Sequence, residues 1–222
     1  MRRACLRRRV PAAVSRLSAA LVLAVSLLAV SLAAGPAVAS DTGPRQTLET
    51  AITRVLDEIK NPDWVNPATR GPLRQRIEDE VYHVFDFREF SSRTVGPRWR
   101  SFTPEQKKRF SDAFADLLLN TYLNKITGYN GEKVAYTGEM ASKDGKRVEV
   151  RTVITMKDGK KTPVNYRMLP KDGSWRVYDV IIENISLVKN YRTQFQDILN
   201  TATPDELIAR VLEKANEVRA QQ

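Results

Sequence analysis

Three short turn sequences constrain the fold of this chain more than any other feature of its sequence. A Lys-Asp-Gly tripeptide occurs at residues 143–145, 157–159 and 171–173, each time between two runs in which apolar and polar residues alternate. Alternation has the period of a β-strand, and Asp-Gly between two such runs is a strong signal for a tight hairpin. Three such turns in succession predict an antiparallel meander. The four predicted strands are residues 133–139, 146–156, 162–169 and 174–182.

Helical periodicity precedes the predicted strands. Apolar residues recur every three or four positions in residues 46–60 and 73–85, and a shorter helix is predicted at residues 86–95. Asn66 before Pro67 fits an N-cap followed by proline at the first helical position, so the second helix is predicted to begin there. Each pattern indicates an amphipathic helix with one face toward a core.

Two further regions carry their own start signals. Thr103-Pro104-Glu105-Gln106 combines a threonine cap, proline at the first position and glutamine three residues on, which predicts a helix that ends at Gly128 and is the most apolar of the chain. After the strands, residues 186–199 and 203–219 are again predicted to be helical. The sequence therefore predicts an α+β fold, in which a curved four-stranded sheet packs against N- and C-terminal helices.

The N-terminus has the pattern of a signal peptide. A leader rich in arginine precedes an apolar run at residues 17–34, and Ala37-Val38-Ala39 fits the small-x-small pattern of signal peptidase. We expect cleavage before Ser40, which leaves residues 40–222 as a single domain. A retained membrane anchor is the alternative, because the apolar run is nearly long enough to span a bilayer.

The charge balance and the side-chain inventory exclude several classes of function. The chain has 36 basic and 26 acidic residues, and removal of the leader lowers its net charge from +10 to about +4. This charge is too small to indicate a nucleic-acid partner. The only cysteine, Cys5, lies in the leader, and the only histidine, His83, cannot build a metal site alone. No catalytic motif is present, so we predict neither an enzyme nor a bound metal or cofactor.

One enzymatic interpretation remains as an alternative. Tyr166 and Tyr178 lie on predicted strands, as do the tyrosines of isomerases that enclose a cavity in a curved sheet. Such an enzyme also needs a base. Asp179 is the only acid in the strand of Tyr178, and adjacent strand residues face opposite ways.

Several of the predicted helices and strands carry wide apolar faces. The helical and strand faces indicate a set of candidate residues that would line an interior space. They are Val81, Phe85, Phe110, Phe114, Leu117, Leu118, Tyr122, Val150, Ile154, Val164, Met168, Val177, Ile181, Val188, Tyr191 and Phe195. An ordinary solid core is the alternative, because periodicity does not distinguish a filled interior from a cavity.

Residues 175–195 are predicted to run from a strand through a turn into a helix with the spacing Val188-x-x-Tyr191-Arg192-x-x-Phe195. In this run the chain resembles the MlaC family, also called the toluene-tolerance auxiliary proteins. The helical half also matches in order. Its matching residues are Phe87, Phe90, Gly96, Trp99, Thr103, Pro104, Glu105, Gln106 and Phe110.

The resemblance implies a periplasmic carrier of phospholipid with a lipid cavity between its sheet and its helices. It implies two partners: an inner-membrane ABC transporter that bears an MCE-domain protein, and an outer-membrane lipoprotein complex. The candidate residues above would then contact the acyl chains. Lys143, Lys146 and Arg147 could guide docking on acidic partners or headgroups, although solvated turn charges are the favoured interpretation.

Three alternatives differ from a phospholipid carrier. Some proteins that resemble this family are associated with hopanoids, rigid polycyclic lipids that need a broader and shorter cavity. A periplasmic scaffold or chaperone would bind protein through the same apolar faces. The isomerase-like enzyme is the third alternative.

Overall fold

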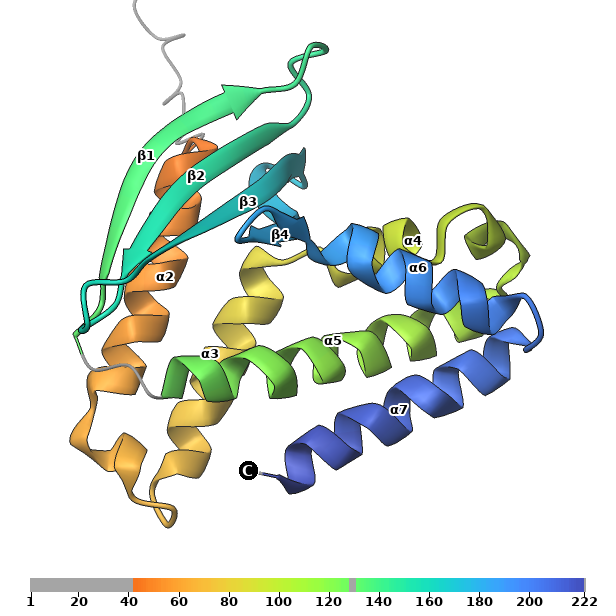
Figure 1. Cartoon of the computed structure of the whole chain (residues 1–222), viewed down its shortest axis with the longest axis horizontal. Helices are drawn as coiled ribbons and strands as arrows, with labels where there is room; N and C mark the ends of the chain where they lie inside the picture. Colours follow the sequence, from red (N-terminus) through yellow and green to blue (C-terminus); the bar gives the residue numbers. More distant parts are fainter. Residues whose placement is uncertain (1–41, 128–130, 222) are drawn as a thin grey trace, which may run out of the picture. The chain divides into compact units, whose positions relative to one another are not determined.

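The computed structural model describes residues 42–127 and 131–221, which belong to one compact unit (Figure 1). The predicted signal peptide and its cleavage site lie outside the described residues. In the described ranges, no helix is both long enough and apolar enough to cross a membrane.

The sheet follows the predicted meander and adds a short fifth strand. Its strands are β1 (Lys133–Ala141), β2 (Val148–Thr155), β3 (Lys161–Lys171), β4 (Ser174–Ile182) and β5 (Ile185–Ser186), in the spatial order β1-β2-β3-β4-β5. All neighbouring strands pair antiparallel. The predicted α+β fold is therefore confirmed. The prediction missed β5 because a two-residue strand has no periodicity and because its turn, Glu183-Asn184, reaches positive φ without glycine.

The N-terminal helices form a hairpin. It contains α2 (Pro44–Lys60), the 3-10 helix η1 (Pro62–Val65) and α3 (Arg70–Val84). The predicted start of the second helix at Asn66 and Pro67 is wrong, because α3 begins at Arg70. The Asn66 side chain accepts a hydrogen bond from the Ala68 amide at 3.0 Å, and its carbonyl accepts one from the Arg70 amide at 2.9 Å. Asn66 thus closes a turn that precedes the helix.

The remaining helices are α4 (Phe87–Val95), the 3-10 helix η2 (Gly96–Ser101), α5 (Pro104–Thr127), α6 (Leu187–Leu199) and α7 (Pro204–Ala220). All of them except η2 begin at a side-chain cap. Thr103 and Gln106 exchange hydrogen bonds of 3.0 and 3.1 Å, which is the predicted capping box. Asp86 caps α4 and Ser186 caps α6.

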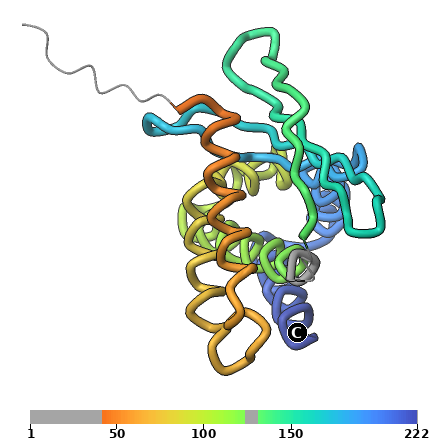
Figure 2. The backbone as a smooth tube through the Cα atoms, turned by 90° about the vertical axis from the view of Figure 1, so that its left-hand side faces the viewer, coloured from red at the N-terminus to blue at the C-terminus, as the bar shows by residue number. Residues whose placement is uncertain are grey.

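The elements pack around one main apolar cluster. In Figure 1, the strands arch over α2, while α5 crosses the molecule with α7 alongside it. In the view of Figure 2, α2, α5 and the strands surround a common central region. The main cluster contains residues from all of these elements, and a smaller one joins the α2–α3 hairpin to Leu123.

A β-bulge in β4 reverses the side-chain alternation of that strand. Arg167 pairs with Asp179 and Met168 pairs with Val177, so Tyr178 is an extra residue. We call the face that carries Val150, Val164 and Met168 the inner face of the sheet. Val177 and, beyond the bulge, Val180 and Ile182 lie on it.

The predicted position of Ile181 is wrong because of this bulge. Its sequence spacing from Val177 predicts a shared face, but Ile181 pairs with Asn165 on the outer face and belongs to neither apolar cluster. One extra residue therefore moves this side chain to the opposite side of the sheet.

Candidate functional site

The structure gathers the other candidate residues in the main apolar cluster. Ten of them are buried: Phe110, Phe114, Leu117, Leu118, Val150, Val164, Met168, Val177, Val188 and Phe195. Five more pack against that cluster and stay partly buried: Val81, Phe85, Tyr122, Ile154 and Tyr191. Their contact with a lipid remains a prediction.

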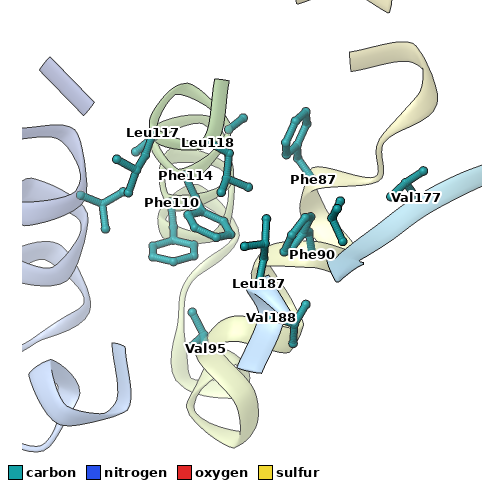
Figure 3. Close-up of a cluster of buried hydrophobic side chains, with 14 of the residues drawn as sticks. Phe87, Phe90, Val95, Phe110, Phe114, Leu117, Leu118, Val177, Leu187 and Val188 are labelled. Atoms are coloured by element: carbon teal, nitrogen blue, oxygen red, sulfur yellow. The ribbon is translucent and has the colours of Figure 1, made fainter. Parts of the chain in front are cut away.

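One end of this cluster is solid. Phe110 and Phe114 on α5 are 0% exposed, and the Phe195 ring from α6 contacts both edge-on, with centroids 5.4 and 5.3 Å away. Phe90 from α4 meets Phe114 edge-on as well, at 5.6 Å (Figure 3). Interlocking rings from three helices bury these four phenylalanines almost completely.

The inner face of the sheet differs from this solid end. Val150 is fully buried in the middle of β2, but Val148 and Ile154 on the same face of that strand are only partly buried. Tyr136 on β1, Tyr166 on β3 and Ile182 on β4 lie on the same face and are also partly buried. Apolar side chains thus face the interior and still have accessible surface.

Helical residues that pack against the same cluster share this partial exposure. Ile52 on α2, Val81 on α3, Tyr122 on α5 and Tyr191 on α6 are each partly buried. The sheet and four helices therefore supply apolar surface that the protein itself does not fully cover. An uncovered apolar interior between a curved sheet and helices fits a ligand that is largely hydrocarbon.

Four tyrosines contribute hydroxyl groups to this region. Burial raises the pKa of Tyr136 to about 12 and that of Tyr191 to about 12. Burial also raises the pKa values of Tyr122 and Tyr166. Their hydroxyl groups therefore lie in surroundings of low polarity, where the neutral phenol is favoured.

The candidate set missed several residues of the inner face and one residue of the helix α2. Val148 and Tyr166 alternate with the candidates Val150, Val164 and Met168, so the period of the strands could have found them. Tyr136 and Ile182 follow only from the observed pairing of β1 and β4, since each strand carries a register shift. Ile52 lies one turn beyond Leu48 on the apolar stripe of α2.

The outer face of the sheet holds a polar network. Asp179, 2% exposed, accepts hydrogen bonds from Ser186 Oγ at 2.7 Å, from the Val188 amide at 3.0 Å and from Arg167 at 3.1 Å. These bonds tie the start of α6 to the sheet. Asp179 is thus committed to structure.

The two tyrosines of the isomerase alternative do not meet. Tyr166 lies on the inner face, whereas Tyr178 lies at the bulge with the Arg93 guanidinium 4.1 Å from its ring centre. Within the described ranges, no three His, Cys, Asp or Glu side chains come close enough together to hold a metal ion.

A separate hollow of about 620 Å³ lies between α3, α4, α5 and the β3–β4 turn. It is lined by charged groups that include two ion pairs, Lys171–Asp86 and Lys108–Asp112, each at 2.7 Å. His83 also lines it and is exposed. This hollow shares only Phe85 with the candidate residues, so it is distinct from the inner face.

Comparison with known proteins finds similar proteins both in sequence and in structure. The chain is 22% identical over 181 residues to the intermembrane phospholipid transport system binding protein MlaC of Haemophilus influenzae, covering 80% of this chain and 85% of that one. A solved structure of a phospholipid-binding protein from Ralstonia solanacearum, in complex with a phospholipid, superposes with a TM-score of 0.70. It shares 27% sequence identity, and the match covers 79% of this chain and 98% of that chain.

The family comparison covers most of the described unit. Residues 49–213 match the family described as MlaC protein, a span from α2 into α7 that includes every strand. This chain therefore belongs to the MlaC family.

Proposed function

We propose that this protein carries phospholipid across the periplasm between the inner and outer membranes, with the acyl chains held against the inner face of its sheet. The observation that carries this proposal is the partly exposed apolar lining formed by the sheet and four helices. It occurs in a fold shared with a protein solved in complex with a phospholipid. The signal peptide predicted at the N-terminus supports export from the cytoplasm.

Hydrocarbon burial sets the demands on such a carrier. Two acyl chains hold about 30 methylenes, and their exposure to water costs on the order of 20–25 kcal/mol at about 0.8 kcal/mol each. A carrier must enclose nearly all of both chains, in a cavity near the upper end of ordinary ligand pockets, ~1,000 Å³. Binding then depends on the chains far more than on the headgroup. We expect less than a hundredfold preference between zwitterionic and anionic lipids of equal chain length.

Partner proteins give the transfer its direction in this proposal. Nothing in the chain suggests an energy source of its own, so net movement follows the relative affinities of the donor and acceptor by mass action. We propose an MCE-domain protein of an ABC transporter as the inner-membrane partner and a lipoprotein complex as the outer-membrane partner. Lys143 and Lys146 are exposed at the β1–β2 turn, where they can meet acidic groups.

Extraction of lipid from vesicles tests the proposal with a matched pair of variants. Ile154 and Val153 are neighbours in β2, both partly buried, but they lie on the inner and outer faces respectively. Wild-type protein and Val153→Glu should extract phospholipid. Ile154→Glu should not, because its carboxylate would be desolvated against acyl chains.

Mass spectrometry of the extracted material identifies the cargo. Phospholipid supports the proposal, and a polycyclic hopanoid would replace the cargo while keeping the carrier role. The proposal fails if the wild-type protein extracts no lipid, or if Ile154→Glu and Val153→Glu extract it equally while both remain folded by circular dichroism.

A further inference from the structure

Tyr166 occupies the middle of the inner face. It lies in β3 directly opposite Val150 of β2 and Val180 of β4. These neighbours are 0% and 8% exposed, but Tyr166 itself is only partly buried. Its side chain is therefore surrounded by apolar groups and still borders open space.

The Tyr166 hydroxyl has no hydrogen-bond partner among the residues that the structure describes. Among the described residues, Ser91 Oγ is the one side-chain polar atom that is fully buried and has no hydrogen-bond partner. The Tyr166 oxygen also has no partner, so it is not fully buried. An unpaired donor in apolar surroundings is costly unless an acceptor reaches it. The open space beside this hydroxyl is where an acceptor from a ligand can lie.

Two other polar side chains of the inner face are already engaged. Thr152 Oγ1 donates to the Val164 carbonyl at 2.6 Å. Glu139, at the edge of the sheet opposite Val150, accepts from the Arg45 amide at 3.1 Å. Tyr166 is thus an unpaired donor at the centre of this face, whereas Tyr136, the other tyrosine of the face, lies on the edge strand β1 opposite Thr152.

The surroundings of Tyr166 favour a neutral acceptor. Its neighbours across both strands are valines, and no basic side chain lies opposite it on the inner face. A phosphate placed here would lose its hydration without gaining a positive partner. An ester carbonyl is a neutral acceptor, and two of them connect the acyl chains of a glycerolipid to its glycerol.

We propose that the Tyr166 hydroxyl donates a hydrogen bond to an ester carbonyl of the bound lipid, so that the protein recognises ester-linked glycerolipids at the linkage of their chains. This inference rests on the proposed carrier function. It makes Tyr166 a positioning residue that sets the depth of the cargo. It also names a chemical class, diacyl lipids, that chain burial alone cannot distinguish from dialkyl ether lipids.

A competition between two lipids tests the inference. Purified protein is mixed with vesicles that contain equal amounts of diacyl and dialkyl ether phosphatidylcholine with matched saturated chains. The extracted lipids are counted by mass spectrometry. One neutral hydrogen bond should give the wild-type protein about a fivefold preference for the diacyl lipid. Tyr166→Phe should bring this ratio close to one, while total extraction stays high.

Tyr178→Phe is the matched control, because it removes the same hydroxyl from the same sheet at the β4 bulge. It should keep the wild-type ratio. No preference in the wild-type protein, or an unchanged preference in Tyr166→Phe, overturns the inference and leaves the carrier function intact. Failure to extract either lipid overturns the carrier function itself. If Tyr166→Phe does not fold, the wild-type ratio alone decides between these outcomes.

Discussion

The two ends of the main apolar cluster use similar side chains and reach different results. At the helical end, Phe90, Phe110, Phe114 and Phe195 interlock and are almost completely buried. At the sheet end, Val148, Ile154, Tyr166 and Ile182 remain partly exposed although they face the interior. Composition therefore does not determine whether an interior is closed. Direct contact between the side chains does, since rings from three helices pack edge-on against one another at the closed end.

The largest effect is expected from truncation at the closed end. Phe114→Ala should lower the free energy of unfolding by about 3–5 kcal/mol, because it removes a ring from a site that cannot collapse. Ile182→Ala at the open end should cost about 1 kcal/mol, since less contact is lost. Urea denaturation of the two variants measures both values. Equal losses would contradict the distinction between the ends.

Removal of lipid should affect the open end selectively. Lipid supplied at about one hundred times its Kd should stabilise the protein by about 2.7 kcal/mol. Hydrogen exchange of the delipidated protein should accelerate in α2 and β2, while residues 110–114 of α5 stay protected. A uniform acceleration across the chain would show that the two ends form one unit.

Enlarging a side chain should also affect the stability of the two ends differently, but by less than truncation does. Ala113 on α5 is 0% exposed, so Ala113→Trp should destabilise the fold by about 1–3 kcal/mol through overpacking. Val148→Trp points a ring toward accessible space and should leave stability nearly unchanged while lipid extraction falls. Thermal unfolding and vesicle extraction on both variants give the comparison. An equally destabilised Val148→Trp would mean that the open end is filled.

The smallest effect concerns the tyrosines of the open end. Burial raises the pKa of Tyr136 to about 12, so its neutral form is favoured in the folded protein. The resulting stability is fully present below the ordinary tyrosine pKa of about 10 and is lost as the pH rises through about 12. An ultraviolet titration of Tyr136→Phe should lose part of the amplitude seen near pH 12 in the wild-type protein, because Tyr191 also ionises there. Loss of amplitude near pH 10 would indicate an exposed phenol.

Local chemistry explains how much of the fold could be predicted. The Asp-Gly turns and the caps at Thr103 and Thr203 act through neighbouring residues, so the sequence alone indicates them. The bulge at Tyr178 depends on pairing between strands, and for this reason Ile181 was predicted on the wrong face.

The candidate site, too, could be predicted only as far as local sequence patterns determine it. Periodicity identified the apolar faces, but the difference between Phe110 and Ile154 in exposure arises from the elements that cover them. Tyr166 was considered for catalysis only. Its place among valines on the inner face follows from strand register, which no single strand encodes.

Native mass spectrometry of the protein purified from cells tests the central claim most directly. If the sheet end is kept open for hydrocarbon chains, the folded protein should carry one phospholipid that is released on denaturation. A bare polypeptide mass, in a protein that also takes up no lipid from vesicles, would contradict the account.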